Sequence, residues 1–476
     1  MNVTILLITL LVGALATYFA GKSAAKVALV VGIAAFVETI VIICQHNQGV
    51  DASFVVQWMR NPNIYFALKA DGLALALVLL TTALTPLIVL SSFGSEIKKV
   101  NSFYGLVLFM SFAMTGTFLA SDGFLYYIFW ELSLIPIYFI ALLWGNDSLE
   151  ARKKAILKFF IYTFAGSLFM LVAFIYLYQK AGSFMLKDLY NLSLTAREQY
   201  WIFLAFFLAY AIKIPIFPFH TWQASTYEKA PTVGTMLLSG IMLKMGLYSI
   251  IRWQLPIAPT AAKELMSTVI ILSLIGVVYG SIVALKQANI KRFFAYSSLA
   301  HVGLIAAGTY SLTLDGLRGA VYQMLAHGFV IVGLFFVAEI IFRRYQTRMI
   351  GEMGGIRQQA VRFASFFMIL MFASIGLPGT FSFIGEFSLL FGLSQVNIWY
   401  AIIGGSTIIF GAFYMLRMFQ KAMLGETNAK PFAEVTRVEG LVLGILVLVV
   451  LFLGIFPKPI TDLITPSLVE IISYIK

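Results

Sequence analysis

Apolar runs of about twenty residues recur along the whole chain, separated by short polar segments. A helix that crosses the hydrocarbon core of a bilayer needs about 20 such residues. Because that core holds no water to bond free backbone groups, each run is predicted to be a transmembrane α-helix. The fourteen runs are residues 2–21, 27–45, 70–92, 102–120, 123–145, 156–179, 201–221, 232–254, 265–285, 292–311, 314–342, 363–391, 398–419 and 437–456.

The composition excludes a soluble globular chain. Of 476 residues, 61% are hydrophobic and 11% are charged, with a mean hydropathy of +0.92, whereas soluble domains are about 25% charged. The net charge of +12 would suggest a nucleic-acid partner for a soluble protein, but in a membrane protein its distribution over the loops matters more. We therefore predict an all-α polytopic membrane protein that contacts the lipid bilayer and no nucleic acid. The first run lacks a basic segment before it, which favours a first transmembrane helix over a cleaved signal peptide.

Lysines and arginines are unevenly distributed among the loops. Segments after odd-numbered helices hold 21 of the 33, segments after even-numbered helices hold 10, and Lys213 and Lys244 lie inside helices. Because cytoplasmic loops are enriched in these residues, we predict a bacterial inner-membrane protein with both termini on the periplasmic side. A miscount by one helix would mix the two sets of loops, so the asymmetry also supports the number fourteen.

The seventh predicted helix carries a lysine that is followed at once by two prolines. Each proline removes a backbone donor and clashes with the carbonyl four residues earlier, so Pro215 and Pro218 should break the helix beside Lys213. A lysine near a helix end that reaches the interface is the ordinary alternative, but Lys213 lies well inside an apolar run. A broken helix with a buried charge is typical of an ion or substrate site in a transporter.

The twelfth predicted helix contains a matching interruption. Pro378 and Gly379 precede a carboxylate, Glu386. Helices seven and twelve are five apart, and a shift by an odd number of spans inverts orientation, so we predict two inverted repeats, helices 4–8 and 9–13, each with one discontinuous helix. The expected parts are residues 1–101 (helices 1–3), 102–254 (first repeat), 265–419 (second repeat) and 437–476 (last helix and a short tail).

Ionisable side chains recur inside the apolar helices. Each would cost several kcal/mol if it faced lipid alone, so we expect them to face inward and to pair. Histidine, with an unperturbed pKa of about 6.5, is a natural relay between a lysine and a carboxylate. We therefore predict a proton path. The candidate residues are Glu131, Lys213, Lys244, His301, His327 and Glu386.

Other polar residues in the helices differ in what their surroundings favour. His327 lies between a glutamine and a glycine in a long apolar helix, which favours a functional role. His301 has small polar neighbours that could hold water, so a relay and a structural group stay equally open. His220, at the end of the broken helix, is more typical of a structural polar group. Glu38 is expected to make structural hydrogen bonds, and Glu339 an ion pair one helical turn from an arginine.

The chain lacks the residues of a redox site. It contains one cysteine, Cys44, so neither a disulfide nor a cysteine-ligated iron–sulfur cluster can form within it. No Gly-x-Gly-x-x-Gly fingerprint or phosphate loop is present either. We expect no cofactor in this chain.

Five segments together resemble the antiporter-like subunits of proton-pumping NADH:quinone oxidoreductase. They are residues 155–167 (AILKFFIYTFAGS), 213–222 (KIPIFPFHTW), 243–246 (LKMG), 289–298 (NIKRFFAYSS) and 323–328 (QMLAHG). Two features make the chain most similar to the middle one of the three such subunits. Glu386 stands where the others usually carry lysine, and the chain stops about twenty residues after its fourteenth helix.

The resemblance implies a subunit that moves protons, driven by quinone reduction elsewhere in the complex. It implies that Glu131 pairs with Lys213 and that Glu386 ends the path on the periplasmic side. Between them a hydrated axis would follow Lys244, His301 and His327. Flavin, iron–sulfur clusters and quinone would belong to other subunits, and the partners would be other membrane-arm subunits, including neighbouring antiporter-like ones.

One segment departs from the family, and three alternative functions stay open. Residues 223–227 read QASTY where the family usually reads LPDAH, so a role for that turn in proton entry is in doubt. A subunit of an Mrp-type cation/proton antiporter would share the fold and most of the buried residues. A stand-alone solute transporter would need a roomy pocket at mid-membrane, and a structural scaffold would leave the buried ionisable residues unexplained.

Overall fold

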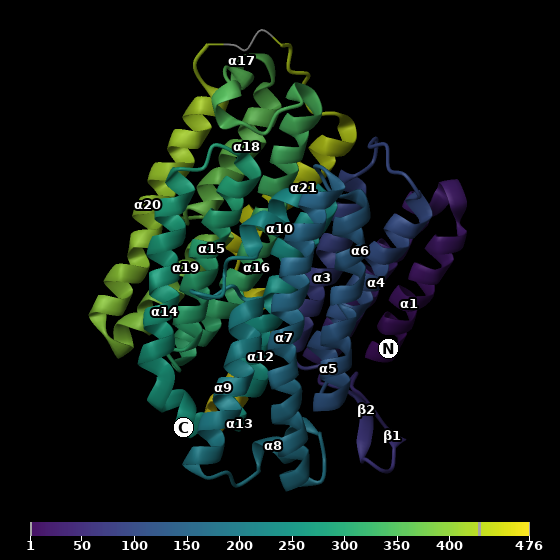
Figure 1. The fold of residues 1–476 in the computed structure, drawn as a ribbon, viewed down its shortest axis with the longest axis vertical. Helices are drawn as coiled ribbons and strands as arrows, with labels where there is room; N and C mark the ends of the chain where they lie inside the picture. Colours follow the sequence, from purple (N-terminus) through teal and green to yellow (C-terminus); the bar gives the residue numbers. More distant parts are fainter. Residues whose placement is uncertain (1, 427–429, 476) are drawn as a thin grey trace. The chain divides into compact units, whose positions relative to one another are not determined.

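The described part of the chain is mostly helical (Figure 1). The computed structural model describes residues 2–426 and 430–475. Met1, the first residue of the first predicted part, and Lys476, the last residue of the last predicted part, therefore lie outside the described residues. The elements up to residue 257 are α1 (Val3–Phe19), η1 (Gly21–Ser23), α2 (Ala24–Asn47), β1 (Phe54–Met59), β2 (Ile64–Leu68), α3 (Gly72–Ser91), α4 (Val100–Leu119), α5 (Gly123–Leu132), α6 (Leu134–Trp144), α7 (Leu149–Ala181), α8 (Leu186–Tyr190), α9 (Ala196–Lys213), α10 (Gln223–Lys229), α11 (Thr232–Leu237), η2 (Leu238–Met242), α12 (Leu243–Ser249), η3 (Ile250–Gln254) and α13 (Leu255–Ile257). The later elements are α14 (Pro259–Leu285), α15 (Ile290–Thr309), α16 (Leu314–Tyr345), η4 (Ile350–Glu352), α17 (Ile356–Gln359), α18 (Val361–Ser374), α19 (Phe381–Val396), α20 (Ile398–Met423), α21 (Arg437–Ile455) and α22 (Lys458–Ile475).

The chain forms two compact units, each assembled from separate stretches of sequence. The first unit comprises Met1–Ile214, Ile241–Ser267 and Ile460–Lys476, and the second comprises Pro215–Gly240 and Thr268–Pro459. The seventh predicted helix is therefore divided between them, because Lys213 belongs to the first unit and Pro215 to the second.

Sequence signals account for both ends of α9. Thr195 and Glu198 form a capping box, in which each side chain accepts a hydrogen bond from the other residue's backbone N–H. The helix ends at Lys213, and the chain then forms turns until α10 begins. Pro215 and Pro218 lie in these turns, where their missing backbone donors do not interrupt a helix.

The second interruption separates α18 from α19. Pro378 and Gly379 lie within it. The backbone takes positive φ angles of 71° at Gly376 and 87° at Gly379, a conformation that glycine adopts without the steric penalty of a Cβ atom. The residue types therefore explain why the helix stops here and resumes at α19.

The stretch from α11 to α13 departs from regular α-helix. The π-helical turns η2 and η3 flank α12, which carries Lys244. Such wide turns are rare and occur frequently at functional sites. A Cβ atom on Gly246 would lie 2.5 Å from Cγ1 of Ile214, so glycine allows α12 to approach the end of α9 closely.

The prediction of a helical membrane protein is confirmed. Each of the fourteen predicted ranges is helical along most of its length. Among the described residues, ten helices are long and apolar enough to cross a membrane, while α1, α18 and α19 are apolar but shorter. The number of crossings, the two inverted repeats and the boundaries of the predicted parts stay predictions.

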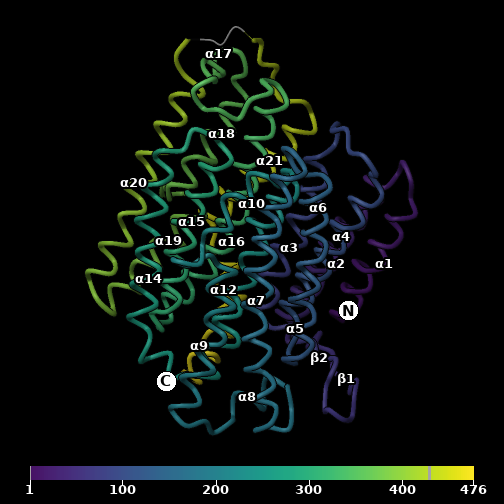
Figure 2. The backbone as a smooth tube through the Cα atoms, in the orientation of Figure 1, coloured from purple at the N-terminus to yellow at the C-terminus, as the bar shows by residue number. Residues whose placement is uncertain are grey.

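The sequence did not predict two elements of the fold, the hairpin of β1 and β2 and the helix α22. Strands β1 and β2 form an antiparallel hairpin, with Phe54 opposite Leu68, in a region that was expected to be a loop (Figure 2). The expected short tail instead forms α22, which buries Ile460, Leu463 and Leu468. It approaches α3 so closely that a Cβ atom on Gly72 would overlap the carbonyl oxygen of Leu463. A helix with a single apolar face does not produce the continuous apolar run that identified the other helices.

Candidate functional site

The first group of candidate residues is Glu131, Lys213 and Lys244, all in the first unit. Together with Trp130 we call it the lysine cluster. Lys213 is the last residue of α9 and is 2% exposed. A cation at this end of a helix meets the negative end of the helix dipole. Its Nζ lies 4.7 Å from the centroid of the Trp130 ring, which is a cation–π contact.

Glu131, the expected partner of Lys213, lies in the last turn of α5 and is half-buried. No ion pair within 4.0 Å joins the two residues, and the Nζ of Lys213 has no hydrogen-bond partner among the described residues. Glu131 is nevertheless the chain neighbour of Trp130, against which Lys213 lies. The structure therefore places the pair in one cluster but in an open arrangement.

Aromatic rings pack around Trp130. Its ring centroid lies 5.7 Å from that of Tyr210. Tyr126 lies 4.9 Å from Trp253, centroid to centroid, and its hydroxyl shares a 2.5 Å hydrogen bond with Ser249. The cluster thus combines a largely apolar wall with a few hydroxyl groups.

Lys244 is fully buried in α12. The apolar window of the span from Thr232 to Ile257 is itself wholly buried, so protein and not lipid surrounds this lysine. This agrees with the expectation that intramembrane charges face inward.

The second group of candidate residues is His301, His327 and Glu386, all in the second unit. Together with Gln323 we call it the carboxylate cluster. Glu386 is 1% exposed. Its Oε1 accepts a 3.1 Å hydrogen bond from Nε2 of Gln323 and lies 3.1 Å from Nδ1 of His301. His327 shares a 3.0 Å hydrogen bond with Ser298, and the two imidazole centroids are 6.3 Å apart.

Close helix packing holds the carboxylate cluster together. Helices α15, α16 and α19 pack against one another (Figure 1). A Cβ atom on Gly385 would lie 2.8 Å from the backbone nitrogen of Gln323, so α19 can approach α16 only because glycine stands there. In the interruption before α19, a Cβ atom on Gly376 would overlap Oε2 of Glu386. Two glycines therefore define the position of this carboxylate.

A small cavity adjoins the two histidines. Its volume is about 10 Å³, and its mostly apolar lining combines Val330, Ile331 and Leu334 with serines and the two histidines. That volume is near the lower limit for one water molecule, which needs two to four polar partners. Among residues 2–426 and 430–475, no group of three or more His, Cys, Asp or Glu is placed to hold a metal ion.

The six candidate residues therefore fall into two groups, one in each unit. Three further expectations concern His220, Glu38 and Glu339, which lie outside these groups. His220 lies between aromatic rings, 5.5 Å from Phe217 and 4.8 Å from Tyr279 by centroid. Glu38 accepts a 2.8 Å hydrogen bond from Thr9, as expected of a side chain that makes hydrogen bonds within the fold.

The expected ion pair of Glu339 is confirmed. Its Oε1 lies 3.2 Å from Nε of Arg343, one turn later in α16. Thr232 also donates a 2.5 Å hydrogen bond to Glu339 Oε2.

Sequence reasoning missed two buried cations, Arg252 and Lys291. Arg252 and Asp71 form an ion pair of 2.5 Å with both residues buried, and Arg252 also donates to the hydroxyl of Tyr248. Lys291 is 1% exposed and donates a 2.8 Å hydrogen bond to the carbonyl of Ala230. Both cations had been counted with the loop residues because they lie near the ends of predicted helices.

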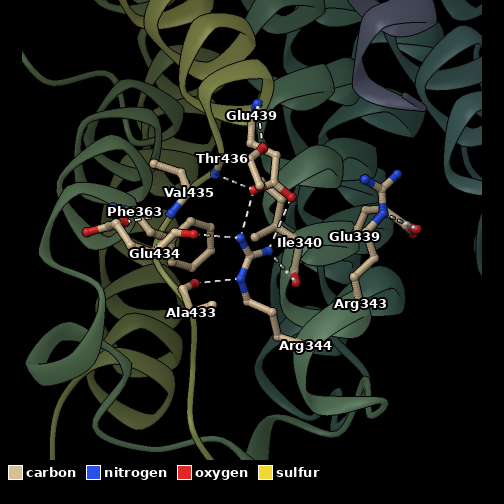
Figure 3. Close-up of polar contacts among 10 residues, drawn as sticks. All are labelled: Glu339, Ile340, Arg343, Arg344, Phe363, Ala433, Glu434, Val435, Thr436 and Glu439. Carbon is tan, nitrogen blue, oxygen red and sulfur yellow. Dashed lines mark hydrogen bonds and ion pairs between the residues drawn. The ribbon is translucent and has the colours of Figure 1, made fainter. Parts of the chain in front are cut away.

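A charged network of a different kind lies at the C-terminal end of α16 (Figure 3). Arg344 donates to both carboxylate oxygens of Glu439, at 3.2 and 2.7 Å, and to the carbonyl of Glu434 at 3.0 Å. The side chain of Glu434 accepts hydrogen bonds from the backbone N–H groups of Arg362 and Phe363, at 2.8 and 2.9 Å. The network thereby links α16 to the first turns of α18 and α21.

Comparisons with known proteins agree over most of the chain. A family model described as "NADH:quinone oxidoreductase/Mrp antiporter, TM" matches residues 120–411. A Rickettsia prowazekii protein named NADH-quinone oxidoreductase subunit M is 38% identical over 453 residues, which cover 93% of this chain and 91% of that protein. The Rhodobacter capsulatus protein of the same name is 35% identical over 472 residues, covering 95% and 91%.

Solved structures show the same fold. A chain of respiratory complex I from Thermus thermophilus with bound NADH has a TM-score of 0.92 and 28% identity, covering 99% of this chain and 100% of that one. A chain of the Mrp complex from a Dietzia species has a TM-score of 0.84 and 19% identity, with 99% of each chain covered, a likeness that shows the fold alone. The chain belongs to the NADH:quinone oxidoreductase/Mrp antiporter family, in which relatives at 35% and 38% identity are named subunit M.

Proposed function

We propose that this chain is a proton-translocating subunit of the membrane arm of respiratory NADH:quinone oxidoreductase, and that it holds no redox centre of its own. The observation that carries this proposal is the buried Lys213 ammonium, which lies against Trp130 and apart from the Glu131 carboxylate. Ionisable residues inside membrane segments mark proton relays and ion pathways. The relatives named subunit M support the same function.

In this proposal the Glu131–Lys213 pair acts as a switch for one proton. When the pair is open, burial disfavours the ammonium form and Lys213 releases its proton. When the pair closes, the carboxylate favours the ammonium form and a proton is taken up. Quinone reduction elsewhere in the complex would reach the pair as a change in charge or hydration. The residues that carry the released proton onward are Lys244, His301, His327 and Glu386.

The energies involved are of the right scale for such a switch. Moving one charge against a potential of 100 mV takes about 2.3 kcal/mol. A tenfold change in proton affinity corresponds to about 1.36 kcal/mol. A change of roughly a hundredfold in the proton affinity of Lys213 between the open and closed pair would therefore suffice to move one proton against about 100 mV.

We propose further that the chain crosses a bacterial inner membrane fourteen times, with both termini periplasmic. Helices 4–8 and 9–13 would form the two inverted repeats. Flavin, iron–sulfur clusters and quinone would lie in other subunits, and other membrane-arm subunits, including antiporter-like ones, would be its neighbours. The uneven distribution of lysine and arginine and the two interrupted helices support this arrangement.

The second candidate function is that of an Mrp-type cation/proton antiporter subunit. The fold similarity to the Dietzia chain favours it, but at 19% identity that similarity extends to the fold alone. Purification in mild detergent of the membrane particle that contains this chain separates the two functions. We expect flavin, iron–sulfur signals and NADH oxidation to accompany it. A particle without redox centres that exchanges sodium for protons would contradict the proposal.

Substitution of the switch residues tests the site itself. Lys213→Ala and Glu131→Gln should each lower NADH-driven proton uptake into proteoliposomes roughly ten-fold or more. Lys153→Ala, which removes an exposed lysine, should pump like the wild type. Wild-type pumping by both variants would contradict the assignment of Glu131 and Lys213 as the proton switch.

A further inference from the structure

A basic pocket of about 250 Å³ lies at the C-terminal ends of α14 and α20. Lys286 follows the last residue of α14, and Arg417 and Lys421 lie in the last two turns of α20. No carboxylate lines the pocket. Unlike Arg344, which binds Glu439, these three side chains have no ion pair or hydrogen bond to any described residue. Three positive charges are therefore free to bind an anion.

An apolar groove of about 400 Å³ runs between the same two helices. Its lining includes Ile271, Ile275 and Ile282 of α14 and Ile403 of α20, all of them more than 40% exposed. On α14, Ile282 precedes Lys286 by four residues, which is about one helical turn. The groove and the basic pocket therefore follow one another along α14.

The lengths of the helices place the pocket at the level of lipid headgroups. With 27 and 26 residues, α14 and α20 are each roughly 40 Å long. This exceeds the hydrocarbon core of about 30 Å. Lys286 lies at the end of α14 and Arg417 lies six residues before the end of α20, so their long side chains reach the headgroup region.

We propose that this surface binds one anionic phospholipid, with its phosphate in the basic pocket and an acyl chain in the groove. Basic pockets between transmembrane helices suit anionic headgroups, and an arginine can hold a phosphate with two parallel hydrogen bonds. The adjoining apolar groove selects a lipid over a soluble phosphate, because a soluble ion would leave the groove unused. This site does not depend on the proton path.

The test uses the intact membrane particle that contains this chain, stripped of loosely bound lipid. It is mixed with phosphatidylglycerol that carries a photoactivatable group on its acyl chain, and the cross-linked peptides are identified by mass spectrometry. We expect cross-links to residues 271–282 or to the first turns of α20. The combined substitution Lys286→Gln, Arg417→Gln and Lys421→Gln should weaken binding by roughly 5-fold per charge, and so by roughly 100-fold in total.

Matched controls decide between the outcomes. The combined substitution Lys22→Gln, Lys153→Gln and Lys154→Gln removes the same charge from exposed lysines outside the pocket and should leave the cross-links unchanged. Arg417→Lys keeps the pocket charge and should bind within a few fold of the wild type. Equal cross-linking by phosphatidylcholine would overturn the proposal. So would full displacement of the lipid by inorganic phosphate, which would instead indicate a site for a soluble anion.

Discussion

The lysine cluster and the carboxylate cluster hold buried charges in opposite ways. Lys213 rests on the face of Trp130 and makes no hydrogen bond to a described residue. Glu386 accepts a hydrogen bond from Gln323 and lies at ion-pair distance from His301. The cation is thus held by a contact with little directionality, whereas one directional hydrogen bond, from Gln323, holds the carboxylate.

Within the proposed proton path, this difference suits the two clusters to different tasks. A cation–π contact is worth about 0.5–2 kcal/mol and tolerates lateral movement of the ammonium, so Lys213 can move towards Glu131 at small cost. A buried carboxylate that loses a directional partner is destabilised by about 1–3 kcal/mol or more. The lysine cluster is therefore suited to switching and the carboxylate cluster to a fixed end of a path.

The largest expected effect comes from removing one carboxylate in each cluster. Glu131→Gln and Glu386→Gln should each lower NADH-driven proton translocation roughly ten-fold or more, which corresponds to about 1.4 kcal/mol of barrier. Because the proposal places both residues on one path, the double variant should lose little more than the stronger single variant. Proton uptake into proteoliposomes measures all three.

Electron transfer serves as the control for this experiment. NADH oxidation by detergent-solubilised particles should stay measurable in each variant, which shows that the complex has assembled. If the fold-losses of translocation in the two single variants multiplied in the double variant, Glu131 and Glu386 would belong to two separate proton paths. That result would contradict the proposal of one path through both clusters.

A smaller effect should come from one glycine in each region. Gly376→Ala places a Cβ atom onto Oε2 of Glu386 and requires a left-handed backbone, which is unfavourable by about 1–2 kcal/mol. Gly246→Ala meets the flexible side chain of Ile214 at 2.5 Å, which costs about 1–3 kcal/mol of packing energy. We expect Gly376→Ala to lower proton translocation several-fold. Gly246→Ala should mainly lower the thermal unfolding midpoint.

Both quantities are measured on both variants. We expect Gly376→Ala to lower translocation more than Gly246→Ala does. We expect Gly246→Ala to lower the unfolding midpoint more than Gly376→Ala does. If the two variants lost translocation equally, Glu386 would not be the more tightly positioned group.

The sequence predicted the elements that depend on local chemistry. Apolar runs located the helices, and the prolines after Lys213 lie where the helix ends, because both signals act within a few residues. The burial of Lys213 and Glu386 followed from their place inside apolar runs.

What the sequence did not reveal depends on distant contacts. The hydrogen bond from Gln323 to Glu386 joins residues 63 positions apart, and the pair of Arg252 and Asp71 joins residues 181 apart. Neither spacing follows from a helical period. The amphipathic helix α22 was not predicted for a related reason. Its apolar face is buried by packing against α3, which is distant in sequence.

A third prediction removes the contact that holds each charged group. Trp130→Leu deletes the ring beneath Lys213 and should reduce proton translocation about three-fold, the lower range of a cation–π contact. Gln323→Leu deletes the donor to Glu386 at similar volume and should lower translocation about five-fold, the lower range for a buried carboxylate that loses a hydrogen bond. Trp130→Phe, which keeps an aromatic face, is the matched control. A larger loss of translocation with Trp130→Leu than with Gln323→Leu would reverse the assignment of tasks.

The smallest expected effect concerns the support of the carboxylate cluster and depends on pH. Partial burial opposes ionisation of Glu434, but hydrogen bonds from the backbone N–H groups of Val435, Arg362 and Phe363 outweigh it and hold the pKa of this carboxyl below its ordinary value. Its ionised form therefore stabilises the start of α18, the helix that leads to the interruption before Glu386 (Figure 3).

Because the folded-state pKa is lowered, this contribution is present above the ordinary carboxyl range, near pH 4.5, and is lost as the pH falls through the folded-state pKa. Hydrogen exchange of the Arg362 and Phe363 amides, corrected for intrinsic rates, should therefore lose protection on acidification below about pH 4.5. Glu434→Gln keeps the side-chain shape without the titrating charge and should show weaker protection that changes little with pH. Identical pH dependence in the wild type and this variant would show that another group fixes the first turn of α18, and that the position of Glu386 does not rest on this network.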